Sequence, residues 1–226
     1  MAGKGAGVKR SAGDNASMNS DAFLQLPALR GPVGLIEFST ALPASAPRAL
    51  AVLCHPHSLF GGSMSNKVVT TMERAFRDLG LATLRFNFRG VGKSEGVFDH
   101  GLGEGEDLAA ACVHAQRALP NLPLWLAGFS FGSYVAARMA KTLGAAQLLS
   151  IAPPVVSWDF TALQRGPAPW LIVQGEQDEV VDPEAVYRFA DGLHPAATLV
   201  RMPGSHFFHG KLVDLRDLLT AHYQNL

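Results

Sequence analysis

A serine lies at the centre of a G-x-S-x-G motif in this chain, in the segment Gly128-Phe129-Ser130-Phe131-Gly132. The motif follows an apolar segment that is predicted to be a strand, and it precedes an Ala-rich segment that is predicted to be a helix. In such a turn the serine has a strained backbone, and the two glycines prevent clashes with the neighbouring chain. The turn would lift the Ser130 hydroxyl above a sheet and point the N–H of Phe131 at a developing oxyanion. The simpler interpretation is a tight turn in which Ser130 caps the helix.

A serine hydroxyl is a weak nucleophile near neutral pH unless a histidine accepts its proton and a carboxylate orients that histidine. Two later segments supply these groups, and each comes directly after a predicted strand. The sequence GEQDEVVDP at residues 175–183 follows a strand at 170–174, and PGSHFFHG at residues 203–210 follows a strand at 198–202. Parallel strands would place both segments at the same edge of the sheet as Ser130.

Within these segments, Asp178 is the preferred carboxylate, because it lies only a few residues beyond its strand and the loop can turn its side chain back toward the sheet. Asp182 is the alternative, but it precedes Pro183 and is better placed as a helix N-cap with proline at the first helical position. His206 is the preferred base, because it is closest to the end of its strand and follows a flexible Gly-Ser pair. His209 is its competitor, with capping or packing at the start of the last helix as its structural role.

The elements that must position these side chains alternate between short apolar segments and longer helical patterns, which is typical of βα units. We therefore predict an α/β fold with a doubly wound, mainly parallel sheet and helices on both faces. Residues 23–29 and 33–38 are expected to form an antiparallel edge hairpin. Strands are predicted at residues 49–55, 82–88, 124–129, 147–151, 170–174 and 198–202. Helices are predicted at residues 65–79, 131–143, 183–190 and 211–223, and a further helix opens with the carboxylates at 104–107.

The composition predicts one domain with a substantial core and argues against several classes of function. The chain has 226 residues, of which 48% are hydrophobic, and its 19 basic residues balance 19 acidic ones. A neutral chain without a local basic cluster lacks the cationic field that binders of nucleic acid or anionic membranes need. Residues 1–20 have almost no large apolar side chain, so we expect a disordered tail followed by one domain at residues 21–226.

No segment has the apolar run of a signal peptide or of a membrane-spanning helix. Cys54 and Cys112 lack the close spacing of a metal site and the density of a disulfide scaffold, so we expect two buried free thiols. These observations predict a soluble cytoplasmic protein, a monomer or a homodimer, that acts on a small molecule.

Five blocks in this order resemble the α/β-hydrolase superfamily, and in particular the small bacterial α/β-hydrolases related to dienelactone hydrolases and short-chain serine esterases. The blocks are HPHSLFGG (55–62), RFNFRGVGKSEG (85–96), GFSFG (128–132), GEQDEVVDP (175–183) and GSHFFHG (204–210). The resemblance implies the α/β-hydrolase fold and a Ser130-His206-Asp178 triad. The usual nucleophile of dienelactone hydrolases is cysteine, so Ser130 in its place favours ester hydrolysis over that lactone chemistry.

The resemblance also implies that the loop after the strand at 49–55 supplies a second N–H to the oxyanion hole beside that of Phe131. Its position assigns this N–H to His57, with Ser58 as the alternative, whereas Pro56 has none to offer. His55 and His57 are two residues apart with no third ligand nearby, so structural hydrogen bonding is favoured over a metal site. No metal or cofactor is expected.

The RFNFRGVGKSEG block resembles the superfamily's Arg-Gly-x-Gly-x-Ser turn, with Asn87 in place of the usual aspartate. We expect it to be structural, with Arg89 forming hydrogen bonds beneath the site. It does not match a phosphate-binding P-loop, because Asn87 stands where that motif needs its first glycine. Nucleotide binding is therefore not expected.

The predicted function is hydrolysis of small carboxylic esters through an acyl-enzyme. Lipase lids are inserted between the strand that ends near residue 151 and the one that starts near 170; that connection is short here, so we expect a minimal lid and short acyl chains. Leu59, Phe60, Trp158 and Phe160 are the candidate pocket residues, although Trp158 and Phe160 could equally fill core below the sheet edge. The alternatives are another acyl hydrolase on the same triad, of thioesterase or peptidase type, or a catalytically silent binding module.

Overall fold

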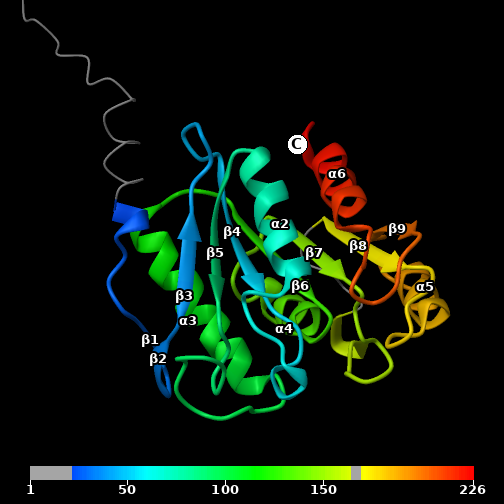
Figure 1. Cartoon of the computed structure of the whole chain (residues 1–226), viewed down its shortest axis with the longest axis horizontal. Coiled ribbons are helices and arrows are strands. Elements are labelled where there is room, and N and C mark those ends of the chain that lie inside the picture. Colours follow the sequence, from blue (N-terminus) through cyan, green and yellow to red (C-terminus); the bar gives the residue numbers. More distant parts are fainter. Residues whose placement is uncertain (1–21, 164–168) are drawn as a thin grey trace, which may run out of the picture.

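A twisted sheet forms the centre of the molecule in the computed structural model, which describes residues 22–163 and 169–226 (Figure 1). The predicted tail at residues 1–20 lies outside the described residues. Within them, the sheet has seven strands in the order β3-β5-β4-β6-β7-β8-β9. The strands are β3 (Phe38–Ala41), β4 (Ala49–Cys54), β5 (Leu81–Phe86), β6 (Leu124–Phe129), β7 (Gln147–Ile151), β8 (Trp170–Gly175) and β9 (Thr198–Met202).

In this sheet, strands β5, β4, β6, β7, β8 and β9 run parallel to one another. Only the edge strand β3 is antiparallel, and it pairs with β5. Parallel neighbours need crossover connections, and here most of these contain an α-helix, whereas the described part of the β7–β8 connection has only a 3-10 turn. The helices are α2 (Lys67–Asp78), α3 (Leu102–Ala118), α4 (Phe131–Ala140), α5 (Pro183–Asp191) and α6 (Leu212–Tyr223). The predicted doubly wound α/β fold is confirmed.

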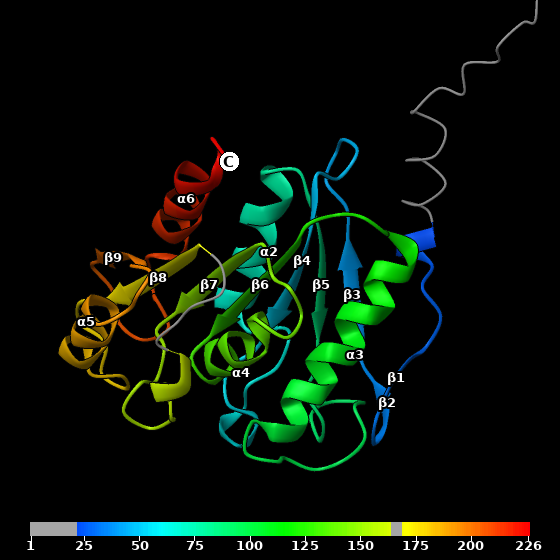
Figure 2. The ribbon, with the colours of Figure 1, turned by 180° about the vertical axis from the view of Figure 1, so that it is seen from behind.

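The helices cover both faces of the sheet. Helices α2 and α6 lie side by side on the face toward the viewer in Figure 1, and α3, α4 and α5 lie on the face seen in Figure 2. Alternate residues of β4 point to opposite faces: Leu50 and Val52 enter the core beneath α3 and α4, whereas Ala51 and Leu53 enter the core beneath α2 and α6. Because both faces of the sheet are covered, its central strands β4 and β6 are continuous apolar runs and are fully buried.

The predicted edge hairpin differs from the observed structure. Residues 22–24 are helical, and a short separate hairpin of β1 (Leu29–Gly31) and β2 (Gly34–Ile36) follows. The chain changes partner at Glu37, whose N–H donates to Ser94 Oγ (2.9 Å), and only then joins the main sheet as β3. Residue Ser94, in the turn after β5, is more than fifty positions from Glu37 along the chain. Local sequence patterns therefore did not indicate that β3 would pair with β5 and not with the preceding strand.

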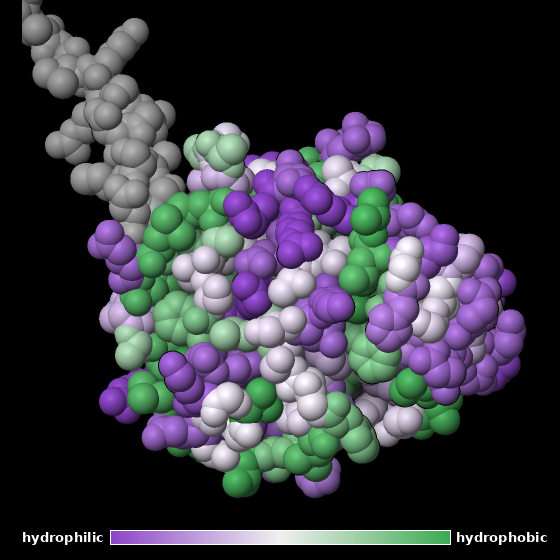
Figure 3. Space-filling model, in the orientation of Figure 1, coloured by the Kyte–Doolittle hydropathy of each residue, from purple (hydrophilic) through white to green (hydrophobic). Residues whose placement is uncertain are grey.

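The connection from β7 to β8 carries one described 3-10 turn, η2 (Thr161–Leu163), and no lid domain among the described residues. Cys54 and Cys112 are free and buried, as predicted. None of the described helices combines the length and the apolar character needed to cross a bilayer. On the surface, Figure 3 shows hydrophobic residues along the lower edge of the view, where the loops after β4 and β5 lie in Figure 1.

Candidate active site

Ser130 lies in a sharp turn between β6 and α4, with φ 51° and ψ −124°. A positive φ is unfavourable for a residue with a Cβ atom, so the surrounding chain must hold it. A Cβ atom at Gly128 would lie 2.2 Å from the carbonyl oxygen of Gly132, and one at Gly132 would lie 2.5 Å from that of Cys54. The Ser130 N–H donates to the Ile151 carbonyl (2.8 Å). The predicted strained turn and its two required glycines are therefore confirmed.

The structure brings Ser130, His206 and Asp178 together, as the sequence predicts. The Ser130 Oγ lies 3.2 Å from His206 Nε2, and His206 Nδ1 lies 2.9 Å from Asp178 Oδ2. The three side chains come from loops after β6, β9 and β8, all at the carboxyl edge of the sheet, and all three are buried. They form an unbroken chain of hydrogen bonds from a hydroxyl to a carboxylate.

The loop after β8 surrounds the Asp178 carboxylate with donors. Its Oδ1 accepts the N–H groups of Val180 (2.9 Å) and Val181 (2.8 Å), and its Oδ2 accepts Gln174 Nε2 (2.9 Å). Burial by itself would raise the pKa of Asp178, but the hydrogen bonds from His206 and from the two backbone N–H groups outweigh it and hold the pKa below its ordinary value. Asp178 is therefore an anion that can only accept hydrogen bonds.

This carboxylate fixes the proton position on the histidine. Because Asp178 accepts, His206 Nδ1 carries a hydrogen, and Nε2 of the neutral ring is left as an acceptor for the Ser130 hydroxyl. The ring packs against Phe129, with ring centroids 4.9 Å apart. The backbone N–H of His206 also donates to Glu179 Oε2 (3.0 Å). The arrangement can withdraw the proton of Ser130 as its oxygen attacks a carbonyl carbon.

Sequence reasoning did not identify two supporting residues, Gln174 and Glu179. Gln174 is fully buried at the carboxyl end of β8 and donates to Asp178. A polar side chain inside an otherwise apolar strand was the signal that could have indicated it. Glu179 is exposed, as expected of a solvated side chain, and no local pattern shows that it also accepts from His206.

The two competing residues take their structural roles. Asp182 caps α5 by accepting the Glu184 N–H (3.0 Å), with Pro183 at the first helical turn. His209 is exposed, and its contact is with the ring of Phe207. Neither side chain joins the hydrogen-bonded chain at Ser130.

The two backbone groups expected at the oxyanion hole lie beside the serine. Phe131 is the first residue of α4, and His57 precedes the 3-10 turn η1 (Ser58–Phe60) and borders the same cavity as Ser130. Among the described residues, no acceptor pairs with the N–H of Phe131 or of His57. Two unpaired N–H groups next to a nucleophile suit a developing oxyanion.

The first histidine of the HPHSLFGG block has a structural role. His55 Nε2 accepts the Phe88 N–H (3.0 Å), so the hydrogen of its neutral ring lies on Nδ1, which donates to the Pro56 carbonyl (2.6 Å). Burial lowers the pKa of His55 to about 4 and thereby keeps the ring neutral. These bonds tie the loop after β4 to the end of β5 and fix the approach of His57 to Ser130.

The RFNFRGVGKSEG turn is likewise structural. Arg89 binds Asp107 through two guanidinium nitrogens, at 3.0 and 2.9 Å, and its N–H donates to the same carboxylate. Asn87, in place of the aspartate usual in this turn, accepts the Met64 N–H and donates to Glu37 Oε2 (2.8 Å each). These bonds attach the turn to Asp107 of α3 on one side and to Glu37, the residue before β3, on the other.

A cavity of about 360 Å³ opens beside Ser130 and His206. Of the four candidate pocket residues, Phe60 borders it. Leu59 is largely exposed and does not border it, and Trp158 lies behind the cavity, packed on the rings of His57 and Phe131. Phe160 is buried against Tyr134 and Phe189, and so fills core, the alternative that sequence reasoning left open. The lining consists of Pro56, His57, Phe60, Gly61, Gly62, Asn66, Ser130, Val180, His206 and Phe207.

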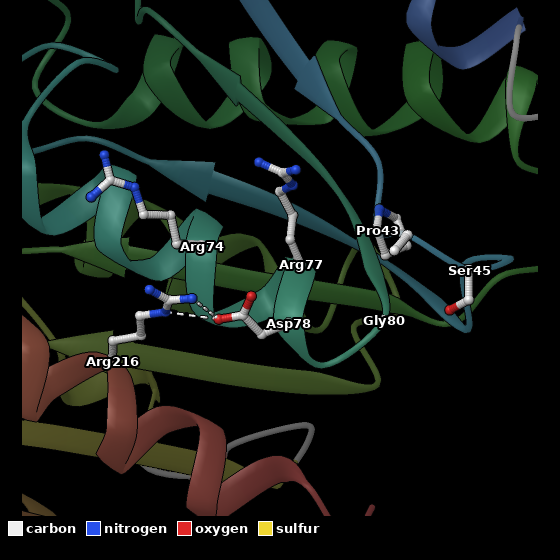
Figure 4. A pocket seen from close by; sticks show the side chains of 8 residues that line it. Pro43, Ser45, Arg74, Arg77, Asp78, Gly80 and Arg216 are labelled. Carbon is white, nitrogen blue, oxygen red and sulfur yellow. Dashed lines mark hydrogen bonds and ion pairs between the residues drawn. The ribbon is translucent and has the colours of Figure 1, made fainter.

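A second hollow, of about 470 Å³, lies at the opposite, amino-terminal edge of the sheet (Figure 4). It is bordered by Arg74 and Arg77 of α2 and by Arg216 of α6, which donates to Asp78 (Nε–Oδ2 2.7 Å). Its lining has no histidine and no buried nucleophile. The buried serine, histidine and carboxylate therefore lie at the carboxyl edge, although the hollow at the other edge is larger.

Comparison with known proteins agrees with this geometry. An α/β serine hydrolase homologue from Coxiella burnetii is 47% identical, with a TM-score of 0.84 over 87% of this chain and 95% of that one. A lidless α/β serine hydrolase from Xanthomonas campestris is 49% identical, with a TM-score of 0.84 over 88% of this chain and 93% of that one. An uncharacterized protein of Rickettsia prowazekii is 36% identical over 80% of this chain and 81% of its own length. No family model matches the chain.

Proposed function

Because the chain belongs to the α/β serine hydrolase superfamily, we propose that it hydrolyses small carboxylic esters through an acyl-enzyme on Ser130. The observation that supports this most directly is the hydrogen-bonded chain from Ser130 through His206 to Asp178, with the histidine held as a proton acceptor. A silent binding module has no need to keep a strained serine, a correctly protonated histidine and a buried carboxylate in contact.

The reaction begins when His206 Nε2 takes the Ser130 proton as Oγ attacks the carbonyl carbon of the ester. Negative charge then develops on the carbonyl oxygen, and the N–H groups of Phe131 and His57 stabilise it. The imidazolium next to Asp178 returns its proton to the alcohol oxygen, which leaves. Water, deprotonated by the same histidine, attacks the acyl-enzyme. The bond between the acyl carbon and Ser130 Oγ breaks, the histidine gives its proton to Oγ, and the carboxylic acid is released.

The cavity favours a short acyl chain. Its volume of about 360 Å³ is at the lower end of small-molecule sites. The only helix or strand in the described part of the connection between β7 and β8 is the single 3-10 turn η2. We expect hydrolysis of p-nitrophenyl esters to be fastest for acetyl to butyryl chains and to decline for long, lipase-type chains.

Labelling with a fluorophosphonate probe tests the function. The wild-type protein should be labelled at one site, and Ser130→Ala should abolish the label, because the probe reacts only with an activated serine. Ser157→Ala is the matched control: Ser157 is exposed and lies outside the site, so this variant should be labelled as the wild type is. Persistent labelling of Ser130→Ala would refute the assignment, and an unlabelled wild type would favour a silent module.

A panel of esters, thioesters and amides with one common acyl group separates ester hydrolysis from its enzymatic alternatives. The proposal expects the ester to be hydrolysed with the largest kcat/KM relative to its uncatalysed rate. A larger enhancement for the thioester or the amide would favour the thioesterase or peptidase alternative on the same triad.

A further inference from the structure

Three large apolar side chains at the mouth of the active-site cavity are exposed to solvent. Phe60 is 87% exposed, Val180 is 62% exposed and Phe207 is 38% exposed, and all three border the cavity. They come from the loops after β4, β8 and β9. Isolated exposed apolar residues are common, but a group around a reactive serine provides a binding surface continuous with the site.

The chemistry of the proposed reaction distinguishes the two sides of this mouth. The alcohol oxygen receives its proton from His206 Nε2, so the alcohol part of the ester must lie on the side of His206. Phe207 follows His206 directly, and its ring stands almost perpendicular to the imidazole, with centroids 5.0 Å apart and an interplanar angle of 87°. Val180 borders the same cavity and comes from the loop that carries Asp178, the carboxylate bound to His206. Phe207 and Val180 therefore line the cavity that His206 shares.

No lysine or arginine lines this side of the mouth. The cavity lining contains no lysine, arginine, aspartate or glutamate. Glu179 is an exposed carboxylate beside this lining, and it accepts the His206 N–H (3.0 Å). Lys67 follows Asn66 at the start of α2 but does not border the cavity. An alcohol with a negative charge would meet apolar side chains and a carboxylate, without a cation to pair with.

We propose that Phe207 and Val180 bind the alcohol part of the substrate and that this part is apolar and uncharged, such as a benzyl or branched alkyl group. The inference rests on the proposed ester hydrolysis and adds to it the substrate class. A methyl ester leaves both side chains without a contact in the complex. A larger apolar alcohol covers them and removes their surface from water in the transition state.

The test compares butyrate esters of benzyl alcohol and methanol, two alcohols of nearly equal acidity. For the wild type we expect kcat/KM to be at least tenfold greater for benzyl butyrate, in the range that small apolar groups give in enzyme pockets (about 10 to 200-fold). Phe207→Ala should lower the benzyl-to-methyl ratio by about tenfold. Val213→Ala, which removes a 70% exposed apolar side chain on α6, should leave the ratio unchanged.

The charge requirement is tested with benzyl butyrates that carry a para-carboxylate or a para-carboxamide, which are similar in size. The carboxylate should be hydrolysed about tenfold more slowly, because no cation lines the site. Equal rates for this pair, or an unchanged benzyl-to-methyl ratio in Phe207→Ala, would refute the inference while ester hydrolysis stood. A wild type that hydrolyses no ester and takes no fluorophosphonate label would refute the proposed function, and the inference with it. Thermal unfolding of each variant identifies a loss of fold.

Discussion

Replacing Asp178 with asparagine should inactivate the site by moving one hydrogen, without removing a contact. The backbone N–H groups of Val180 and Val181 both donate to Oδ1, and backbone groups cannot become acceptors. The asparagine oxygen must therefore keep the Oδ1 position, which places the amide NH₂ at the Oδ2 position. There it faces two donors, His206 Nδ1 and Gln174 Nε2, each 2.9 Å from Oδ2 in the wild type. Nδ1 also lies 3.1 Å from Oδ1, but its hydrogen would still oppose the amide hydrogens at the nearer position.

Both donors can adapt, with different consequences. Gln174 can rotate its amide and present Oε1, which is buried and has no hydrogen-bond partner among the described groups. His206 can accept from the new NH₂ only if its hydrogen moves from Nδ1 to Nε2. The imidazole then donates to Ser130 and cannot accept its proton. Loss of the correct tautomer in Ser-His-Asp triads lowers the rate about 10⁴-fold, which corresponds to about 5 kcal/mol of transition-state stabilisation.

The assay is kcat/KM on p-nitrophenyl butyrate together with the rate of fluorophosphonate labelling, and both should fall about 10⁴-fold. Because the bonds around residue 178 can be re-formed and only the bond from Gln174 Nε2 to the Gly175 carbonyl (3.2 Å) is lost, the free energy of unfolding should fall by no more than about 1.5 kcal/mol. Asp182→Asn is the matched control: asparagine caps helices as well as aspartate does, so activity and stability should be retained. Activity of Asp178→Asn within tenfold of the wild type would refute the assignment of Asp178, and inactivation by Asp182→Asn would support the competing carboxylate.

Further expectations concern the fold around the site. Gly132→Ala should lower the free energy of unfolding by about 3 kcal/mol, because its Cβ would lie 2.5 Å from the carbonyl oxygens of Cys54 and His55. Gly192→Ala, whose Cβ would have its nearest neighbour at 3.5 Å, should change this free energy by no more than about 0.5 kcal/mol, and urea unfolding measures both variants. Burial raises the pKa values of the Cys54 and Cys112 thiols, so a thiol reagent should label neither until the protein unfolds, and rapid labelling of the native state would contradict the packing. Because the pKa of Asp178 is lower in the folded chain, its contribution to stability is complete at neutral pH and is lost as the pH falls from the ordinary aspartate value through the lowered one. Asp178→Asn should lack this part of the acid dependence, and identical acid profiles for the two proteins would contradict it.

Local sequence patterns predicted the strands that carry the site with little error. Strand β6 and strand β9 have the predicted bounds, because each is a short apolar run that ends at a glycine- or proline-containing loop. The predicted ends of the helices were less accurate than those of the strands. The first long helix was predicted from residue 65, but it begins at Lys67, because the Asn66 side chain accepts the Val68 N–H and caps it.

The reactive residues were predictable because their requirements are local. Gly128 and Gly132 are needed wherever a serine stands in this strained turn, and loops at the carboxyl ends of parallel strands meet at one edge whatever their distance along the chain. Ser130 and His206 are 76 positions apart, yet the order of the strands brings them to 3.2 Å. Sequence alone therefore determined the nucleophile, the base and the preferred acid as a set.

Tertiary structure decided what surrounds that set. The donation of Gln174 to Asp178, the burial of Phe160 in the core and the exposure of Phe207 beside His206 each depend on which loops pack against one another. The burial and the contacts of a side chain depend on neighbours that come from distant parts of the chain. The spacing of residues within one segment therefore does not predict them. The sequence thus determined which residues act together as nucleophile, base and acid, and the assembled loops decided how the carboxylate is held and which apolar side chains border the cavity.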